Sequence, residues 1–99
     1  MDAIGIALSG MQSAQTRVAV SAHNVANLLT DGFRPQRAVQ TSVSAGGSQA
    51  SVAMAASPES VSFDQEIIDQ IVAKNQYEAS ARVLSVSAEM RGSLLDLFT

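Results

Sequence analysis

The chain has 99 residues, enough for a single domain over 1–99, and its formal charge of −3 provides no basic surface for nucleic acid. The absence of cysteine excludes a disulfide framework, a thiolate metal site and a cysteine nucleophile. Hydrophobic residues make up 46% of the chain, but 16 residues are Ala and only 4% are aromatic. This composition predicts long, closely packed helices rather than a rounded globule.

The uncharged stretches 3–16 and 38–58 are interrupted by Gly, Ser and Gln. Neither reaches the roughly 20 strongly apolar residues that a membrane-spanning helix requires. The first basic residue is Arg17, so the N-terminal region lacks the positive charge of a cleavable secretion signal. We expect no direct insertion into lipid, and a chain that is either soluble or exported without a cleaved leader.

The segment 2–30 is predicted to be a helix because its apolar residues recur with the spacing of a coiled-coil seam. Asp2 is expected to cap its start, and Gly32 to end it in a left-handed conformation. Gly5 and Gly10 each lower helix stability by about 1 kcal/mol. The predicted seam comprises Ile4, Leu8, Met11, Gln15, Val18, Ala22, Val25 and Leu29.

The middle segment, 31–62, differs sharply in composition. Residues 38–62 include seven Ser, six Ala and a single charged residue, Glu59. The Gly46–Gly47 pair suits the turn of a short hairpin, and a mobile linker is the alternative. The composition slightly favours an irregular loop with at most a weak two-stranded element.

The segment 63–98 is the strongest predicted helix because neither Gly nor Pro occurs between Pro58 and Gly92. Asp64 is the expected cap, with Phe63 and Ile68 as a hydrophobic staple. Two apolar stripes run along this helix. The first comprises Ile68, Val72, Ala79, Val83, Val86, Met90, Leu94 and Leu97, and the second comprises Ile67, Ile71, Ala81, Leu84, Ala88, Leu95 and Phe98.

These segments predict an all-α fold in which long N- and C-terminal helices form an antiparallel coiled-coil-like hairpin. A Ser/Ala/Gly-rich segment, irregular or weakly β, would join them. A helix pair of this size buries too little area to be comfortably stable alone. Because one partner helix cannot cover two apolar stripes, we expect assembly with further copies or partners.

No pattern in the chain predicts catalysis, cofactor binding or a metal site. His23 is the only histidine and has no carboxylate one helical turn away, so a solvent-facing or partner-contacting ring is expected. Asp64, Glu66 and Asp69 cluster at a helix start, where the helix dipole favours acids. Nucleophile-elbow and phosphate-loop motifs are absent. The sequence therefore predicts a protein that is not an enzyme.

Two stretches carry a resemblance to one family. Residues 22–34, AHNVANLLTDGFR, resemble the N-terminal signature of bacterial flagellar rod, hook and hook-associated proteins, with His23 where the family usually has Asn. Residues 71–83, IVAKNQYEASARV, are similar to the C-terminal helix of the same family, and the ending that contains Glu89–Met90 and Leu94–Leu95 is similar to its closing segment.

The resemblance implies a structural subunit of the flagellar basal-body rod, whose paired terminal helices assemble into an axial tube for motility. It implies export by the flagellar type III apparatus, and as partners copies of the chain itself and other rod- and hook-type proteins. The candidate subunit-packing residues are Asn24, Ala26, Asn27, Thr30, Gly32, Phe33, Ile71, Tyr77, Glu78, Ala79, Leu84, Met90 and Leu94.

The middle segment is too short for the large β-rich inserts of hook and distal-rod proteins. Its size is closest to that of a proximal-rod-type subunit in the periplasm. The alternative is a small soluble helical-bundle adaptor, a reduced relative that does not enter the axial structure. The physics of the helix pair alone supports both interpretations.

Overall fold

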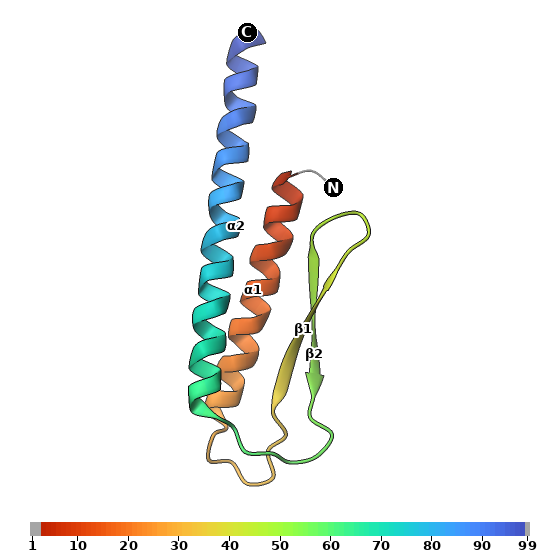
Figure 1. The fold of residues 1–99 in the computed structure, drawn as a ribbon, viewed down its shortest axis with the longest axis vertical. Coiled ribbons are helices and arrows are strands. Elements are labelled where there is room, and N and C mark those ends of the chain that lie inside the picture. Colours follow the sequence, from red (N-terminus) through yellow and green to blue (C-terminus); the bar gives the residue numbers. More distant parts are fainter. Residues whose placement is uncertain (1–2, 99) are drawn as a thin grey trace.

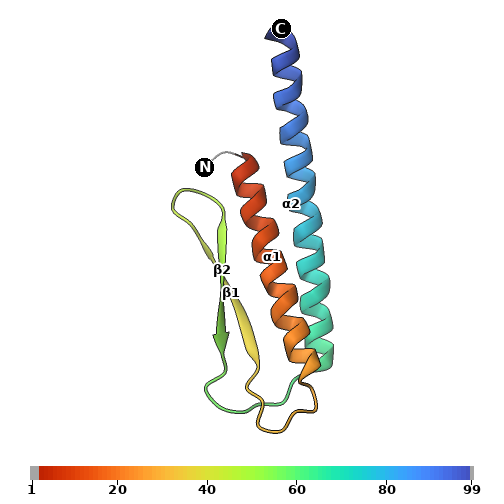
Figure 2. The ribbon, with the colours of Figure 1, turned by 180° about the vertical axis from the view of Figure 1, so that it is seen from behind.

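A computed structural model describes residues 3–98. Helix α1 spans Ala3–Ala26, strands β1 and β2 span Gln36–Ser42 and Ser48–Met54, and helix α2 spans Phe63–Phe98 (Figure 1). The two helices lie antiparallel, and the hairpin lies along α1 on the side away from α2 (Figure 2). The result is an elongated molecule with extents of 63 × 24 × 14 Å.

Helix α2 has the bounds predicted from its uninterrupted run of helix-forming residues, but its cap is different. The Ser62 hydroxyl accepts a hydrogen bond from the Gln65 N–H at 3.4 Å, and the Ser62 carbonyl accepts one from the Glu66 N–H. Ser62 is therefore the cap, and the prediction of Asp64 was wrong. Asp64 lies in the first turn, where its charge still suits the helix dipole.

Helix α1 ends at Ala26, four residues before the predicted end at Thr30. The Leu28 N–H bonds to the Val25 carbonyl at 3.1 Å, a three-residue spacing that tightens the final turn. The predicted cap Asp2 lies outside the described residues.

The middle segment contains a regular antiparallel hairpin, so the preference for an irregular loop was wrong. Its strands pair from Gln36 opposite Met54 to Ser42 opposite Ser48. Gly46 and Gly47 have φ angles of 102° and 89° in the turn, which glycine adopts without strain. The fold is therefore mostly helical rather than purely all-α.

Hydroxyl and amide groups attach the hairpin to α1. The Ser48 hydroxyl lies 3.0 Å from that of Ser13, and the Ser48 N–H donates to the Ser9 hydroxyl at 3.1 Å. Further along, Arg17 donates to the Gln40 side-chain carbonyl at 3.2 Å. Specific polar contacts thus hold the hairpin against α1.

Small side chains form the contact between α1 and α2. Ala14 and Ala73 are fully buried, and a Cβ added to Gly10 would lie 2.5 Å from the Ser80 hydroxyl oxygen. The Gln76 side chain reaches across to the Gly10 carbonyl at 3.3 Å. Such residues allow close backbone approach but bury little apolar area.

The α1 residues that face α2 lie one position away from the predicted apolar seam. Ala7, Ala14 and Ser21 are buried and recur every seven residues, whereas Leu8 and Val18 from the predicted seam are exposed. The predicted seven-residue spacing was right, but the predicted residues were wrong by one position. Small and polar side chains, not the large apolar ones, face α2. The residues in register with α2 are Ala7, Gly10, Ala14, Arg17, Ser21 and Asn24.

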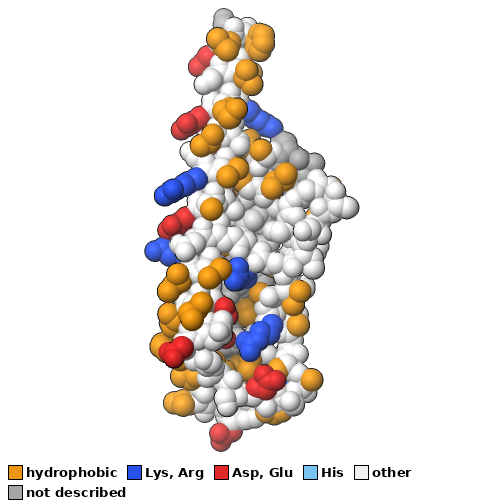
Figure 3. Space-filling view, viewed as in Figure 1, with side chains coloured by type: hydrophobic (Ala, Val, Ile, Leu, Met, Phe, Trp, Pro, Cys, Tyr) orange, Lys and Arg blue, Asp and Glu red, His pale blue; other side chains and the backbone are white. Residues whose placement is uncertain are grey.

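Large apolar side chains lie almost entirely on the outside of the described chain. Among residues 3–98, Val20 is the only Val, Ile, Leu, Met or Phe that is buried. Exposed apolar side chains run along α2 and gather at its free end (Figure 3). Neither described helix has a stretch both long and apolar enough to span a bilayer. The isolated chain therefore presents more apolar surface than a stable monomer normally leaves uncovered.

Replacing Gly10 with Ala tests the close helix contact. The methyl group gains about 1 kcal/mol of helix propensity, but the Ser80 hydroxyl must rotate away to make room for it, which should offset part of that gain. In a Ser80→Ala background, where the nearest remaining atom lies 3.4 Å away, Gly10→Ala should stabilise the protein. Chemical denaturation followed by circular dichroism measures both free energies of unfolding.

Gly92→Ala is the matched control, because nothing lies within 4 Å of its added Cβ. It should have the same effect in both backgrounds. An equal effect of Gly10→Ala with and without the Ser80 hydroxyl would contradict the close contact.

Candidate functional site

Asn24 links three elements of the fold. The side-chain NH₂ group of Asn24 donates to the Gln36 backbone carbonyl and to the Glu66 carboxylate, both at 2.9 Å. The side-chain carbonyl of Asn24 accepts from the Gln36 backbone N–H, also at 2.9 Å. The residue is only 1% exposed. Asn24 therefore pairs with the Gln36 peptide as a neighbouring strand would, and joins the end of α1 to β1 and α2.

Glu66 is the acidic partner in this cluster and is 2% exposed. The Glu66 carboxylate lies 3.5 Å from the Arg37 guanidinium. The Glu66 backbone carbonyl accepts a hydrogen bond from the Ser21 hydroxyl at 3.0 Å. Gln70 donates in turn to Ser21 at 3.1 Å. A buried carboxylate is costly unless paired, so Asn24 and Arg37, which both contact the Glu66 carboxylate, make its burial tolerable.

The remaining N-terminal motif residues shape the exit from α1. The Asn27 amide donates to the His23 carbonyl at 2.9 Å, and the Thr30 hydroxyl donates to the Asn27 side-chain carbonyl at 3.2 Å. Gly32 has a φ of 71°, the left-handed conformation, but it lies in a turn six residues after α1 ends at Ala26, so the prediction that it ends the helix was wrong. Ala26 is the last residue of α1 and is exposed.

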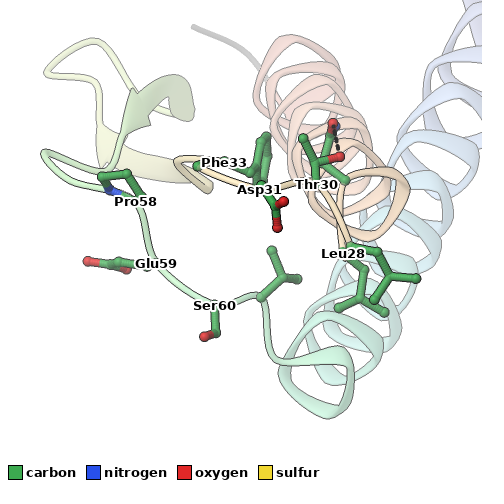
Figure 4. A pocket seen from close by; sticks show the side chains of 11 residues that line it. Leu28, Thr30, Asp31, Phe33, Pro58, Glu59 and Ser60 are labelled. Carbon is green, nitrogen blue, oxygen red and sulfur yellow. Dashed lines mark hydrogen bonds between the residues drawn. The ribbon is translucent and has the colours of Figure 1, made fainter.

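Phe33 holds the departing chain against α1. Its ring packs on the His23 imidazole with a centroid distance of 5.4 Å, and its carbonyl accepts from the Glu59 N–H at 3.2 Å. This second bond joins the loop after α1 to the loop before α2. Between these loops is a hollow of about 450 Å³ that includes Leu28, Asp31 and Glu59 in its lining (Figure 4).

The candidate residues on α2 do not form one cluster with Asn24. They are spread along the helix, with Ile71, Glu78, Ala79, Met90 and Leu94 exposed and Leu84 half-buried. Tyr77 lines a mostly apolar hollow of about 550 Å³ between the helices, together with Ala14, Val18 and Ala73. Their roles in subunit packing stay a prediction.

Sequence reasoning missed the structural role of Glu66, Ser21 and Gln70. Glu66 was interpreted only as an acid that suits the helix start. Its partner Asn24 is 42 residues away, and only the antiparallel register of the helices brings the two together. No local pattern in a single sequence indicates such a pairing.

The described residues show a structural cluster rather than a reactive one. No group of three or more His, Asp or Glu side chains in residues 3–98 is placed to hold a metal ion. Every buried polar side-chain atom in that range has a hydrogen-bond partner. The polar cluster is thus fully used in holding the elements together.

Asn24→Ala tests this role. It leaves the Glu66 carboxylate and both Gln36 peptide groups without their amide partner, so we expect a loss of about 3 kcal/mol in the free energy of unfolding. Chemical denaturation measures the loss, and amide hydrogen exchange at Gln36 should become faster.

Asn27→Ala is the control within the same motif. Asn27 makes local bonds near solvent, so its replacement should cost about 1 kcal/mol or less. Equal losses in the two variants would contradict a special role for Asn24.

Comparison with known families matches both ends of the chain. The family described as "Flagella basal body rod protein" matches residues 4–34, which cover α1 and the loop after it. The family described as "Flagellar basal body rod FlgEFG protein C-terminal" matches residues 60–97, which cover α2. No curated protein matches the chain. The two matches occur in the expected order, and the chain therefore belongs to the flagellar basal body rod protein family, as a structural component and not an enzyme.

Proposed function

We propose that this subunit builds the wall of the rod by packing its exposed apolar surfaces against neighbouring subunits. The observation that carries the proposal is the inverted distribution of side chains. Small and polar groups hold the chain together, whereas large apolar groups face outward. Covering those outward surfaces would supply the hydrophobic stabilisation that the single chain lacks.

α1 leaves much of the two apolar stripes of α2 uncovered. Ile68, Val72 and Val86 of the first stripe are exposed, as are Ile67 and Ile71 of the second. Because α1 covers neither stripe fully, each can contact a different neighbour. Contacts between unlike surfaces propagate into a helical array rather than closing into a dimer, which is the geometry of a tube.

The groove between α1 and α2 offers a specific place where a neighbouring subunit can bind. Fully buried Ala14 and Ala73 form its floor, while Val18 and Tyr77 are partly exposed beside it. An apolar side chain from a neighbouring helix would fill this groove as a knob fills a hole. Tyr77 suits such an interface because its ring packs while its hydroxyl remains hydrated.

The proposal extends to location and delivery. We infer a place in the periplasmic part of the basal-body rod, beside other rod- and hook-type subunits. Family membership supports this location. It also supports export through the flagellar type III apparatus without a cleaved leader. The α1–α2 contact buries little apolar area, so the single chain gains little stability by folding. Keeping it unfolded for export therefore costs little free energy. The small hairpin in place of a large insert favours a proximal-rod-type subunit.

Ile71→Asp and Val86→Asp test the proposal with one variant for each stripe. Both side chains are 54% exposed, so the changes should leave folding and secretion intact. A charge buried between subunits is strongly unfavourable, and we expect at least a tenfold loss of incorporation into basal bodies. Quantitative mass spectrometry of secreted protein and of purified basal bodies measures the two quantities.

Ser85→Asp is the matched control, because it adds the same charge at an exposed polar position that belongs to neither stripe. It should be incorporated normally. Leu84 is less suitable because it is half-buried within the single chain. Normal incorporation of both stripe variants would contradict packing through the stripes, and secretion without any incorporation of the unmodified chain would favour the soluble adaptor.

A further inference from the structure

We propose that the hairpin joins two neighbouring subunits by strand addition, in which the outer edge of β2 pairs antiparallel with the outer edge of β1 in a second copy. This inference rests on the proposed rod function and names one contact between its subunits. The segments that would pair are 52–54, called here the β2 edge, and 40–42, called here the β1 edge. Each lies in the second half of its strand.

The direction of each backbone group in the hairpin follows from the hydrogen bonds at its two ends. The Ala55 N–H donates to the Pro35 carbonyl at 2.8 Å, and the Val43 N–H donates to the Gly47 carbonyl at 3.1 Å. Antiparallel strands alternate between pairs that exchange hydrogen bonds and pairs whose peptide groups point outward. In the observed register, the even-numbered residues of both strands therefore point their N–H and C=O groups away from the partner strand.

Helix α1 occupies the first half of each outer edge. At the start of β1, the Asn24 side chain bonds to both outward groups of Gln36, as a third strand would. At the start of β2, the outward N–H of Ser48 donates to the Ser9 hydroxyl. The strands cross in the view of Figure 1, so that β1 lies nearer α1 at the lower end and β2 lies nearer α1 at the upper end. The second half of each strand thus faces away from α1.

The backbone groups of the β1 edge and the β2 edge are open to a partner. Within residues 3–98, no hydrogen bond reaches the outward groups of Gln40, Ser42, Val52 and Met54. All four residues are exposed, and both apolar side chains among them are more than half exposed. Residues 38–54 contain neither a charged residue nor proline. Such residues normally protect an edge strand from pairing, so their absence leaves these edges suited to strand addition.

The directions of the strands select the unlike edge of a second copy as the partner. Because β1 and β2 run antiparallel, antiparallel pairing of the β2 edge with the β1 edge of a second copy leaves both chains pointing the same way along their long axes. Antiparallel pairing of two β2 edges would turn one chain end over end. Copies in a helical array built from unlike contacts share one direction, so only the unlike pairing fits the proposed rod.

One register brings all the open groups together. It places Val52 opposite Ser42 and Met54 opposite Gln40 of the second copy. Each of these pairs would then exchange backbone hydrogen bonds in both directions. The added strand would also cover part of the two apolar side chains, which gives the contact a hydrophobic contribution.

Cysteine cross-linking tests this register, because the full chain has no cysteine of its own. Ala53 would lie opposite Thr41 of the second copy, in the kind of pair whose side chains approach most closely. Within one chain, Ala53 lies opposite Arg37, four residues before Thr41. At about 3.4 Å per residue, that separation is too large for a disulfide within the chain.

Purified Thr41→Cys and Ala53→Cys chains are mixed at high concentration under mild oxidation, and the heterodimer linked by a disulfide is quantified. We expect it to form at least ten times faster than the heterodimer of Gln49→Cys and Ala53→Cys chains. Gln49 is the matched control, because it is exposed and lies directly opposite Thr41 in the hairpin. It belongs to the half of β2 whose outer edge faces α1.

Val52→Pro tests the backbone pairing itself. It removes an outward N–H that the hairpin does not use, and proline is tolerated at such positions of an edge strand. Added to the Ala53→Cys chain, it should slow linkage to Thr41→Cys chains at least tenfold. Val52→Thr keeps both the N–H and the branched shape, so it should leave the rate unchanged. Unchanged linkage in the proline variant would contradict strand addition.

Equal rates for the Thr41 and Gln49 mixtures would overturn the proposal, as would faster linkage of Ala53→Cys chains to one another, which would indicate pairing of like edges. These outcomes are separate from incorporation into basal bodies. If the stripe variants fail to incorporate but the cysteines do not link selectively, the rod function stands and the edge contact is wrong. Selective linkage of a chain that is absent from basal bodies would keep the edge contact and contradict the rod function.

Discussion

Small side chains let α1 and α2 approach each other closely, and this spacing limits which side chains the interior of the chain can hold. An added Cβ at Gly10 would meet the Ser80 hydroxyl, and Ala14 and Ala73 are fully buried where the helices meet. Large apolar side chains are consequently displaced to the outer sides of the pair, where nothing in the described chain covers them. A protein that is stable as a single chain would bury these apolar side chains in its core. We propose that this chain depends on neighbouring subunits for that hydrophobic stabilisation.

The polar cluster around Asn24 determines how the elements pack together, because so small an apolar interior cannot specify one arrangement by itself. It connects α1, β1 and α2 through directional hydrogen bonds, and therefore sets the register of the helices and the position of the hairpin. In this interpretation the N-terminal family motif has two physical tasks. Asn24 joins elements that are distant in sequence, while Asn27, Thr30, Gly32 and Phe33 shape the turn after α1.

Local features of the chain could be predicted from the sequence, and long-range pairing could not. The bounds of α2 followed from its unbroken helix-forming composition, and the Gly46–Gly47 pair indicated the hairpin turn even though a loop was preferred. The contact seam was misplaced by one residue because the largest apolar side chains were assumed to face the partner helix. Family resemblance was visible in two short motifs, but the Asn24–Glu66 pair depends on a helix register that no local pattern contains.

We infer that neighbouring subunits cover the outward apolar surfaces in an axial assembly. Quantitative mass spectrometry of hook–basal bodies purified from the native organism can test this inference. The chain should co-purify in a fixed, stoichiometric ratio to the other rod components. Reproducible absence of the chain from preparations that contain those components would rule out this assembly, because the apolar surfaces would then have to be covered elsewhere.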